Sequence, residues 1–373
     1  MFRTIKKTKK PLFKGSFFLD LFQIDLILLI LKLHWLFLIE FYILLKKPNK
    51  RIQMKHFIKK QFGSSIFILI LTTISGTSLF AQSTDHEAFI GKWDLNVTMG
   101  DHVAPSWLEV KLSGIKTLVG YFVAESGSAR PISKVNFDEG MINFSIPPQW
   151  SGGNDMHLSA KVSDGQLQGQ IMSSLGEVYS FTGSKAPLLK RNEPIAWTKA
   201  KPLFNGMNTD GWIAQLGEEN NQWVAKDGVL VNPKSGSNLI TKDAYDDFKL
   251  HIEFKYPANS NSGIYLRGRY EVQVEDSYGK EPSSILLGGV YGFLSPNENV
   301  AKKPGEWQSY DITLIGRKVT IEANGKTILW NQSIPGITGG AIDSNEGAPG
   351  PIMLQGDHGE VQFRNISIQV PKS

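Results

Sequence analysis

One stretch of the chain, residues 261–276, gathers the residue types on which a functional site could be built. Polar and aliphatic residues alternate on both sides of Gly268, which predicts two short strands turning at this glycine, each with one buried face. Tyr, Arg, Glu and Gln together suit directional hydrogen bonding and ring stacking, whereas a merely solvated face more usually carries Lys, Thr and Ser. We therefore expect a polar, aromatic-lined sheet face. Its members are Gly263, Tyr265, Arg267, Glu271, Gln273 and Glu275.

Several of these side chains could move or stabilise charge. Arg267 is permanently charged and could hold an anion or clamp hydroxyl groups, or it could form a buried ion pair with Glu253 or Glu271. Any one of Glu253, Glu271 and Glu275 could be an acid or a base, although carboxylates on a sheet also pair structurally. His358, in the segment Gln355-Gly356-Asp357-His358-Gly359, titrates near neutrality and could exchange a proton, or it could simply be an exposed loop residue.

Aromatic and amide side chains in the same region could bind a sugar. An aromatic face suits the C–H groups of a sugar ring, and an amide orients hydroxyl groups through its paired donor and acceptor. Ordinary sheet packing is the competing interpretation for the aromatic residues, most of all for Trp307. The substrate-binding candidates are Asn261, Tyr265, Gln273, Tyr291 and Gln355.

Motifs for other chemistries are missing from the sequence. Asp276, Glu271 or His358 could ligate a divalent metal, but there is no His-x-x-x-His or comparable ligand spacing, so we predict neither a metal nor another cofactor. There is no phosphate loop, dinucleotide fingerprint or nucleophile elbow either, which argues against a bound nicotinamide and against serine-hydrolase chemistry.

The basic character of the chain belongs to its first residues. The formal net charge is +5, but residues 1–81 hold 14 of the 40 Lys and Arg and only 3 of the 35 Asp and Glu, leaving 26 basic against 32 acidic residues from Gln82 onward, a net of −6. Charge therefore gives no support to nucleic-acid binding.

The N-terminal region predicts export. Residues 54–81 have the basic start, apolar run and small-residue end of a signal peptide, with Gln82 as the mature start, so we expect a periplasmic or secreted protein. The chain has no cysteine, hence no lipoprotein anchor and no disulfide. We interpret residues 1–53 as upstream sequence translated from too early a start; an extra membrane segment is the alternative, although residues 17–45 carry four charges that are costly in a bilayer.

Two all-β domains are expected after the leader. Residues 85–184 read as roughly eight short strands, with hairpin turns at Asp138-Glu139-Gly140 and Ser163-Asp164-Gly165, which predicts a small antiparallel barrel or sandwich. Its Trp107, Trp150 and His157 could line a cavity, but tryptophan in a small barrel more often lies in the core or at the rim, so we assign no site there. Residues 185–201 form a proline-interrupted, basic linker.

Residues 202–371 read as about a dozen strands with long loops, which favours a two-sheet jelly roll. Turns are expected at Asp227-Gly228 and Asn324-Gly325, and a strand over residues 288–293. Neither domain shows a convincing helical pattern, so the fold class is all-β.

Motifs spread along residues 202–371 resemble those of one known family. Among them are Leu203-Phe204-Asn205-Gly206, Asn261-Ser262-Gly263-Ile264, Tyr270-Glu271-Val272-Gln273, Pro304-Gly305-Glu306-Trp307 and Pro351-Ile352-Met353-Leu354-Gln355. Over about residues 201–371 the chain resembles the 3-keto-disaccharide hydrolase domain family, formerly a domain of unknown function. The resemblance implies a concanavalin-like jelly-roll β-sandwich and an exported bacterial protein, and it does not cover the N-terminal domain.

The resemblance also implies a substrate whose sugar C3 hydroxyl is already a ketone. Such a carbonyl acidifies the C2 proton and lets the C1 oxygen leave by β-elimination, and later addition of water gives net hydrolysis. The site then needs a base near C2, donors for the enolate oxygen and an acid for the departing oxygen, rather than the opposed carboxylates of an ordinary glycosidase. The candidates for these catalytic roles are Glu253, Arg267, Glu271 and His358.

We therefore expect an exported enzyme that cleaves the glycosidic bond of 3-keto-glycosides or 3-keto-disaccharides. Its partners would be a glycoside or oligosaccharide substrate and, upstream in the pathway, a separate sugar 3-oxidoreductase. The alternative is a non-catalytic, lectin-like carbohydrate-binding module, because the same fold serves both classes. The sequence leaves open the glycoside, the anomer, elimination against direct hydrolysis, and which residue is the proton-transfer base.

Overall fold

The computed structural model describes Lys32 and residues 85–150, 152–194 and 196–372. Apart from Lys32, the predicted upstream segment (residues 1–53) and signal peptide (residues 54–81) lie outside the described residues. Within the described part, no helix is long and apolar enough to span a membrane. The barrel and the sandwich described below lie in one compact unit, Thr84–Ser373.

The regular elements of the described residues are nearly all β-strands, as predicted. Their elements are η1 (Asp85–Phe89), β1 (Gly91–Met99), β2 (His102–Ser113), β3 (Thr117–Val123), β4 (Arg130–Asp138), β5 (Met141–Ile146), β6 (Met156–Ser163), β7 (Gln166–Met172), β8 (Val178–Lys185), β9 (Lys201–Pro202), β10 (Trp212–Ala214), η2 (Glu218–Asn220), β11 (Val224–Lys226), β12 (Val229–Asn232), β13 (Leu239–Thr241), β14 (Phe248–Lys255), β15 (Asn261–Leu266), β16 (Tyr270–Glu275), β17 (Gln308–Ile315), β18 (Lys318–Ala323), β19 (Lys326–Ser333), β20 (Met353–Leu354) and β21 (Val361–Gln369).

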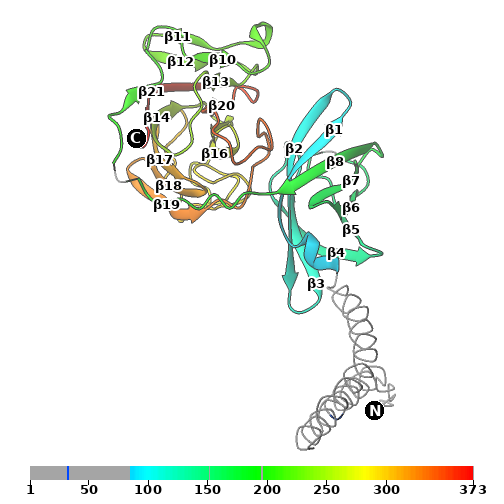
Figure 1. The fold of residues 1–373 in the computed structure, drawn as a ribbon. Helices are drawn as coiled ribbons and strands as arrows, with labels where there is room; N and C mark the ends of the chain where they lie inside the picture. Colours follow the sequence, from blue (N-terminus) through cyan, green and yellow to red (C-terminus); the bar gives the residue numbers. More distant parts are fainter. Residues whose placement is uncertain (1–31, 33–84, 151, 195, 373) are drawn as a thin grey trace, which may run out of the picture. The chain divides into compact units, whose positions relative to one another are not determined.

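Strands β1 to β8 close into an antiparallel barrel, which decides between the barrel and the sandwich that the sequence left open (Figure 1). Each strand pairs with the next along the chain, and β8 pairs back with β1. Burial alternates with the side-chain period of two; in β5, for example, Ile142, Phe144 and Ile146 are buried and the residues between them are exposed. Every second side chain therefore fills the barrel interior.

Four hairpin turns lie where the sequence predicted them. In each pair the first residue has φ between 48° and 53° and the glycine has φ between 75° and 78°. Positive φ at both central positions matches the right-handed twist of the flanking strands and is tolerated best by Asn, Asp and Gly. The pairs are Glu139-Gly140, Asp164-Gly165, Asp227-Gly228 and Asn324-Gly325.

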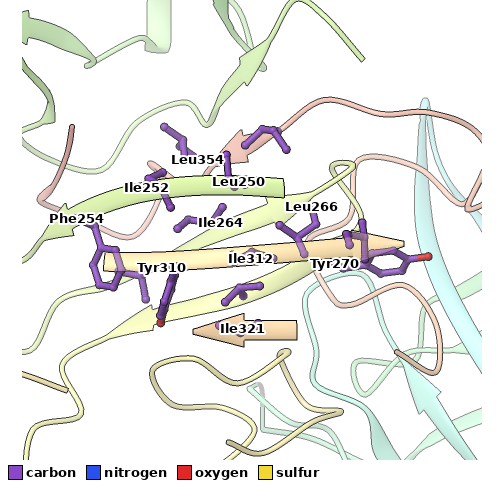
Figure 2. Close-up of a cluster of buried hydrophobic side chains, with 14 of the residues drawn as sticks. Leu250, Ile252, Phe254, Ile264, Leu266, Tyr270, Tyr310, Ile312, Ile321 and Leu354 are labelled. Atoms are coloured by element: carbon purple, nitrogen blue, oxygen red, sulfur yellow. The ribbon is translucent and has the colours of Figure 1, made fainter. Parts of the chain in front are cut away.

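The remaining strands form a two-sheet sandwich. One sheet has five strands in the order β10-β13-β20-β15-β16, and the other has the order β11-β12-β21-β14-β17-β18-β19 with β9 paired to β21. Both sheets contribute to one apolar core, in which Ile252 and Phe254 of β14 belong to the same cluster as Ile264 and Leu354 of the five-stranded sheet (Figure 2). The predicted sandwich is therefore present, and β15–β16 lies at one edge of its smaller sheet.

Two local predictions were wrong. Residues 288–293 form no strand; Val290 instead makes isolated bridges with Val272 and Leu294. In the hairpin β15–β16 both faces are buried, and not only the aliphatic one. The polar face is covered because the segment 338–341 lies on it: the Glu271 backbone N–H donates to the Thr338 hydroxyl at 3.0 Å, and the Tyr265 hydroxyl donates to the Gly339 carbonyl at 3.1 Å.

The barrel packs directly against the sandwich. Trp107 of β2 is fully buried within the apolar cluster of the sandwich, and its ring meets Phe293 edge-to-face with centroids 5.2 Å apart. The Ser344 hydroxyl donates to the Leu95 carbonyl of β1. The buried aromatic contact and this hydrogen bond together fix the barrel on this side of the sandwich.

A pair of buried carboxyl groups lies where the barrel and the sandwich are in contact. Asp94 of β1 is hydrogen-bonded to Glu346, which also accepts hydrogen bonds from the Tyr270 hydroxyl at 2.6 Å and from Arg317. Burial, and next the adjacent Glu346, raises the pKa of Asp94 to about 8. Asp94 is therefore mostly protonated in the folded protein at neutral pH.

Replacing Asp94 by Asn should stabilise the fold, by an amount that grows as pH rises from about 4 to 8. In that window the folded state binds a proton that the unfolded aspartate has lost, so the contribution of Asp94 to stability decreases with rising pH. Asn has the same shape and no such titration. In urea unfolding, the free energy of unfolding of Asp94→Asn should exceed that of the wild type by about 1–3 kcal/mol at pH 8 and by less at pH 5.

The exposed Asp101, in the turn between β1 and β2, provides the matched control. Asp101→Asn removes one exposed carboxylate, so it measures how far the loss of a surface charge alone changes the free energy of unfolding at each pH. An equal effect of Asp94→Asn at pH 5 and pH 8 would contradict the raised pKa of Asp94.

Candidate active site

A cavity of about 420 Å³ opens on the polar face of the β15–β16 hairpin. Most of its lining comes from the five-stranded sheet and the loops beside it, and two residues come from the barrel. The lining residues are Ser126, Trp150, Asn261, Tyr265, Glu271, Gln273, Tyr291, Gly339, Gly340, Gln355, Asp357 and His358.

The antiparallel ladder sets the floor of this cavity. Tyr265 lies directly opposite Glu271, and Gly263 lies opposite Gln273. Directly opposed side chains in such a ladder have their Cβ atoms about 4.5–5.5 Å apart, so the tyrosine hydroxyl and the glutamate carboxyl share one space. Gly263 leaves room for this carboxyl group, because a Cβ at that position would stand 2.4 Å from Oε1 of Glu271 and the glutamate would have to move.

A second wall is formed by the end of β20 and the loop that follows it. β20 pairs with β15, and the Gln355 backbone N–H donates to the Gly263 carbonyl at 2.9 Å. The loop that carries Asp357 and His358 is then held by Asn232, whose side-chain amide donates to the carbonyls of Gly356 and Gly359. The cavity thus has His358 on a fastened loop and Glu271 on a strand.

Glu271 is a buried acid. Its side chain is only 4% exposed, and this burial raises its pKa to about 8, although the Tyr265 hydroxyl and His358 act in the opposite direction. At neutral pH the carboxyl group is therefore mainly protonated and can donate a proton, as a general acid must.

His358 forms a pair with its neighbour Asp357. The imidazole Nδ1 lies 2.6 Å from Oδ1 of Asp357, and this hydrogen bond raises the pKa of His358 above its usual value. A carboxylate on one ring nitrogen orients the imidazole and leaves the other nitrogen to exchange protons. The His358–Asp357 pair therefore has the two groups that a histidine general base commonly uses.

Three amide oxygens at the cavity have no partner. They are Oδ1 of Asn261, Oε1 of Gln273 and Oε1 of Gln355, all buried and without a hydrogen bond. A buried acceptor without a donor costs about 1–3 kcal/mol, so such groups in a cavity indicate a ligand that supplies donors. Hydroxyl groups would do so.

The structure brings seven of the nine predicted site residues to this one cavity. They are Asn261, Tyr265, Glu271, Gln273, Tyr291, Gln355 and His358. The sequence interpretation did not assign Asp357, although it directly precedes the chosen histidine. It also assigned no role to Ser126 or Trp150, because nothing local in the barrel sequence indicates that these residues reach the other domain.

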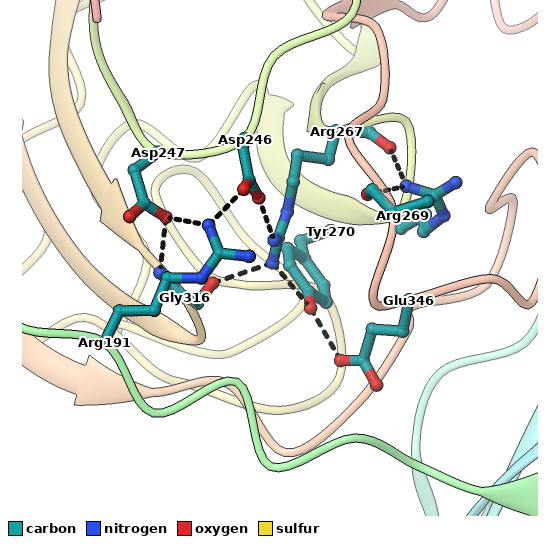
Figure 3. Close-up of polar contacts among 9 residues, drawn as sticks. Arg191, Asp246, Asp247, Arg267, Arg269, Tyr270, Gly316 and Glu346 are labelled. Atoms are coloured by element: carbon teal, nitrogen blue, oxygen red, sulfur yellow. Dashed lines mark hydrogen bonds and ion pairs between the residues drawn. The ribbon is translucent and has the colours of Figure 1, made fainter. Parts of the chain in front are cut away.

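Arg267 does not line the cavity. Figure 3 shows its side chain among Asp246, Tyr270 and Gly316. Arg267 has φ of 54° at the turn of the hairpin, so the alternation ends before it. Its fully buried guanidinium pairs with Asp246 at 3.2 Å and donates to the Tyr270 hydroxyl and the Gly316 carbonyl. The structure therefore places it in an ion pair, as the structural interpretation held, but with Asp246 rather than with Glu253 or Glu271.

Glu253 also lies away from the cavity. It is on β14 of the other sheet, where its carboxylate accepts hydrogen bonds from Arg364 and Asn365, each at 2.7 Å. Trp307 lies nearby with the Arg364 guanidinium 3.9 Å from its ring centroid, which is a packing role. Of the four predicted catalytic residues, only Glu271 and His358 share a site.

The part of the chain that the structure describes contains no group of three or more His, Asp or Glu side chains placed to hold a metal ion. The expectation that the protein uses neither a metal nor another cofactor stays a prediction from the sequence.

Comparison with known proteins assigns a family to the sandwich. Residues 199–369 match the model of the 3-keto-alpha-glucoside-1,2-lyase-like domain. The chain belongs to this family. The lyase-like domain, as we now call it, carries every residue of the cavity lining except Ser126 and Trp150. The family is the one that the sequence motifs resembled, so that prediction is confirmed.

Solved structures give further similarities. One candidate glycosyl hydrolase from Parabacteroides distasonis is 30% identical, over 48% of this chain and 92% of its own, with a TM-score of 0.42. A second from the same organism is 27% identical, over 46% of this chain and 100% of its own, with a TM-score of 0.38. A carbohydrate-binding module of Bacillus subtilis, CBM66, is 13% identical, over 42% of this chain and 94% of its own, with a TM-score of 0.30. Among curated proteins, no sequence matches the chain.

Substituting Arg267 by Met should destabilise the lyase-like domain by about 3 kcal/mol, because Asp246, the Tyr270 hydroxyl and the Gly316 carbonyl all lose a donor. Denaturant unfolding measures the loss. The folded fraction should keep the function of the cavity, since the guanidinium does not line it.

Arg364→Met is the comparison variant, because it removes a partly exposed pair whose loss should cost about 1 kcal/mol or less. A stable but inactive Arg267→Met protein would contradict this structural role and show that Arg267 acts in the site.

Proposed function

We propose that this chain is an exported enzyme that cleaves the glycosidic bond of 3-keto-glycosides, including 3-keto-disaccharides, by elimination followed by addition of water. Membership of the lyase-like family supports a carbohydrate-active, glycoside-cleaving enzyme in general. The observation that carries the proposal is one cavity that holds a buried, protonated Glu271 and the His358–Asp357 pair among unpartnered amide oxygens.

The first half of the reaction would use His358 as the base. A ketone at C3 makes the C2–H bond acidic, and neutral His358 takes this proton while the electron pair moves into the enolate. Asp357 stabilises the imidazolium that results. Tyr291 can assist by donating a hydrogen bond to the enolate oxygen, because burial raises its pKa to about 12 and keeps its hydroxyl protonated.

The second half would use Glu271 as the acid. The enolate re-forms the C3 ketone, the C1–C2 double bond forms, and the C1–oxygen bond breaks as the leaving oxygen takes the proton of Glu271. Water then adds at C1 and C2 regains a proton, which gives the 3-keto-sugar and the free aglycone. The unpartnered oxygens of Asn261, Gln273 and Gln355 would accept hydrogen bonds from the sugar hydroxyls.

A lectin-like module remains the competing function. A binding site needs amides and aromatic rings but has no use for two titratable groups with raised pKa values in the same cavity. The ketone itself would come from a separate oxidoreductase of the sugar C3 hydroxyl, and export would follow from the predicted signal peptide.

The proposal predicts that 3-keto-glucosides are cleaved and their unoxidised parents are not. The purified protein is incubated with each in heavy water, and aglycone release and deuterium at C2 are followed. Equal cleavage of the parents would overturn the keto-sugar mechanism. Binding without cleavage of either would establish the lectin-like alternative.

The pH profile of kcat/KM on a 3-keto-glucoside should be a narrow bell. Activity falls at low pH as His358 gains a proton, with a midpoint above the usual histidine value, and it falls above about pH 8 as Glu271 loses its proton. Asp357→Asn removes the carboxylate that raises the pKa of His358, so the acidic limb should move to lower pH. Glu271→Gln should remove the alkaline limb and lower kcat by roughly 10²–10⁴-fold.

Glu253→Gln is the matched control, since this glutamate of the same domain lies outside the cavity. It should keep the bell and most of the rate. The assignment of roles would be wrong if Glu271→Gln kept the alkaline limb or Asp357→Asn left the acidic limb in place.

A further inference from the structure

The barrel closes one side of the catalytic cavity. The connection after β3 lies against the lyase-like domain, where the Gly340 backbone N–H donates to the Glu125 carbonyl at 2.6 Å. The connection after β5 is joined to it, because the indole Nε1 of Trp150 donates to the Ser126 carbonyl at 3.2 Å. Ser126 and Trp150 both line the cavity. The barrel thus contributes wall residues that the family domain by itself lacks.

A second cavity of about 360 Å³ adjoins the catalytic one. The two share four lining residues, which are Trp150, Asn261, Gln273 and Tyr291. Beyond them the second cavity is lined almost wholly by polar groups, and Ile285 is its one aliphatic side chain among the described residues. A molecule that lies in the catalytic cavity can therefore continue into the second one past Trp150.

Two side chains at the boundary between the cavities present groups that can bind a polar ring. Trp150 is 69% exposed, although its N–H is already bonded, so the ring itself is the part available for contact. Gln273 is 2% exposed, and its Oε1 has no hydrogen bond. An uncovered indole next to a buried acceptor suits a sugar ring, which offers C–H groups on a face and hydroxyls at its edge.

We propose that Trp150 of the barrel and Lys280 bind the leaving group of the substrate in this adjoining cavity, and that through them the barrel selects leaving groups that are a second sugar or a similarly hydroxylated ring over alkyl or aryl groups. The inference rests on the proposed function, because it assigns the other half of that substrate. Trp150 stacks on the leaving ring. Lys280, which lines the same cavity with its ammonium 3.5 Å from Glu275, binds the hydroxyls of that ring.

An apolar aglycone would need a different place. The mouth of the barrel holds a cavity of about 280 Å³ with mainly apolar walls, including Met99, Phe122 and Ile171. This volume is ample for an aromatic ring, since about 150 Å³ suffices for benzene. However, the barrel cavity shares only Ser126 with the catalytic cavity, against four residues for the polar one. The shared walls therefore favour the hydroxylated leaving group.

The test compares two substrates with the same reacting sugar, a 3-keto-glucosyl-glucose disaccharide and methyl 3-keto-glucoside. With the wild-type full chain, kcat/KM should be at least tenfold higher for the disaccharide. In Trp150→Ala this ratio should fall about tenfold, and Trp150→Phe, which keeps a stacking ring but not the N–H donor, should retain most of it. Lys280→Ala should lower the ratio as well.

Two variants serve as controls for loss of a surface side chain. Trp330 is 72% exposed and lines neither cavity, and Lys326 is an exposed lysine paired with Glu298. Trp330→Ala and Lys326→Ala should leave the ratio unchanged. Thermal unfolding of each variant separates a loss of fold from a loss of contact.

The outcomes are distinct from those that test the proposed function. If the wild type cleaves neither 3-keto substrate, the proposed function fails first. If it cleaves both but Trp150→Ala and Lys280→Ala leave the ratio unchanged, the leaving-group site is refuted while the enzyme stands. A wild type that prefers 3-keto-glucosides with alkyl or aryl aglycones over the disaccharide would also overturn the proposal and point to the barrel cavity.

Discussion

The site depends on one constraint, which is that the β15–β16 hairpin is buried on both faces. Its aliphatic side packs into the core of the sandwich, and its polar side faces the cavity under the segment 338–341. A carboxyl group in such a place is desolvated and keeps its proton, which is why Glu271 can be an acid near neutral pH. Gly263 makes the arrangement possible, since any larger residue would displace that carboxyl group. The same pair of strands therefore contributes to the core of the sandwich and to the floor of the cavity.

The turn of this hairpin explains why Arg267 supports the site without entering it. With φ of 54°, the residue leaves the strand, and its guanidinium joins Asp246, Tyr270 and Gly316 instead of following Tyr265 into the cavity. Tyr270 in turn donates to Glu346 (Figure 3). Glu346 is also hydrogen-bonded to Asp94 of the barrel. Buried hydrogen bonds therefore connect the end of the hairpin to the first strand of the barrel. A connected polar network of this kind restricts how the two units can pack.

Local patterns in the sequence were enough to predict most strands and turns, but they could not predict contacts between distant parts of the chain. The pairs Asp164-Gly165 and Asn324-Gly325 specify their own backbone conformation, so both turns lie where the sequence placed them. Period-two alternation could find the polar face of the hairpin, and hence Tyr265, Glu271 and Gln273 together. The partner of Arg267 depends on a loop in another part of the sandwich, which no alternation encodes. Trp150 is harder still, because its contact with the cavity exists only after two separately patterned units have packed together.

The division of the cavity between these two units has a consequence for specificity. The proposed proton-transfer groups and the unpartnered amides all lie within residues 199–369, the part that matches the family model, so the proposed bond-breaking chemistry can be common to that domain. The walls supplied by Ser126 and Trp150 come from a barrel outside that match. Reacting atoms tolerate little variation in their surroundings, whereas the group that departs can be recognised by any surface placed beside it. A separate domain at the mouth of a fixed catalytic cavity can therefore change which glycosides enter without disturbing how they are cleaved.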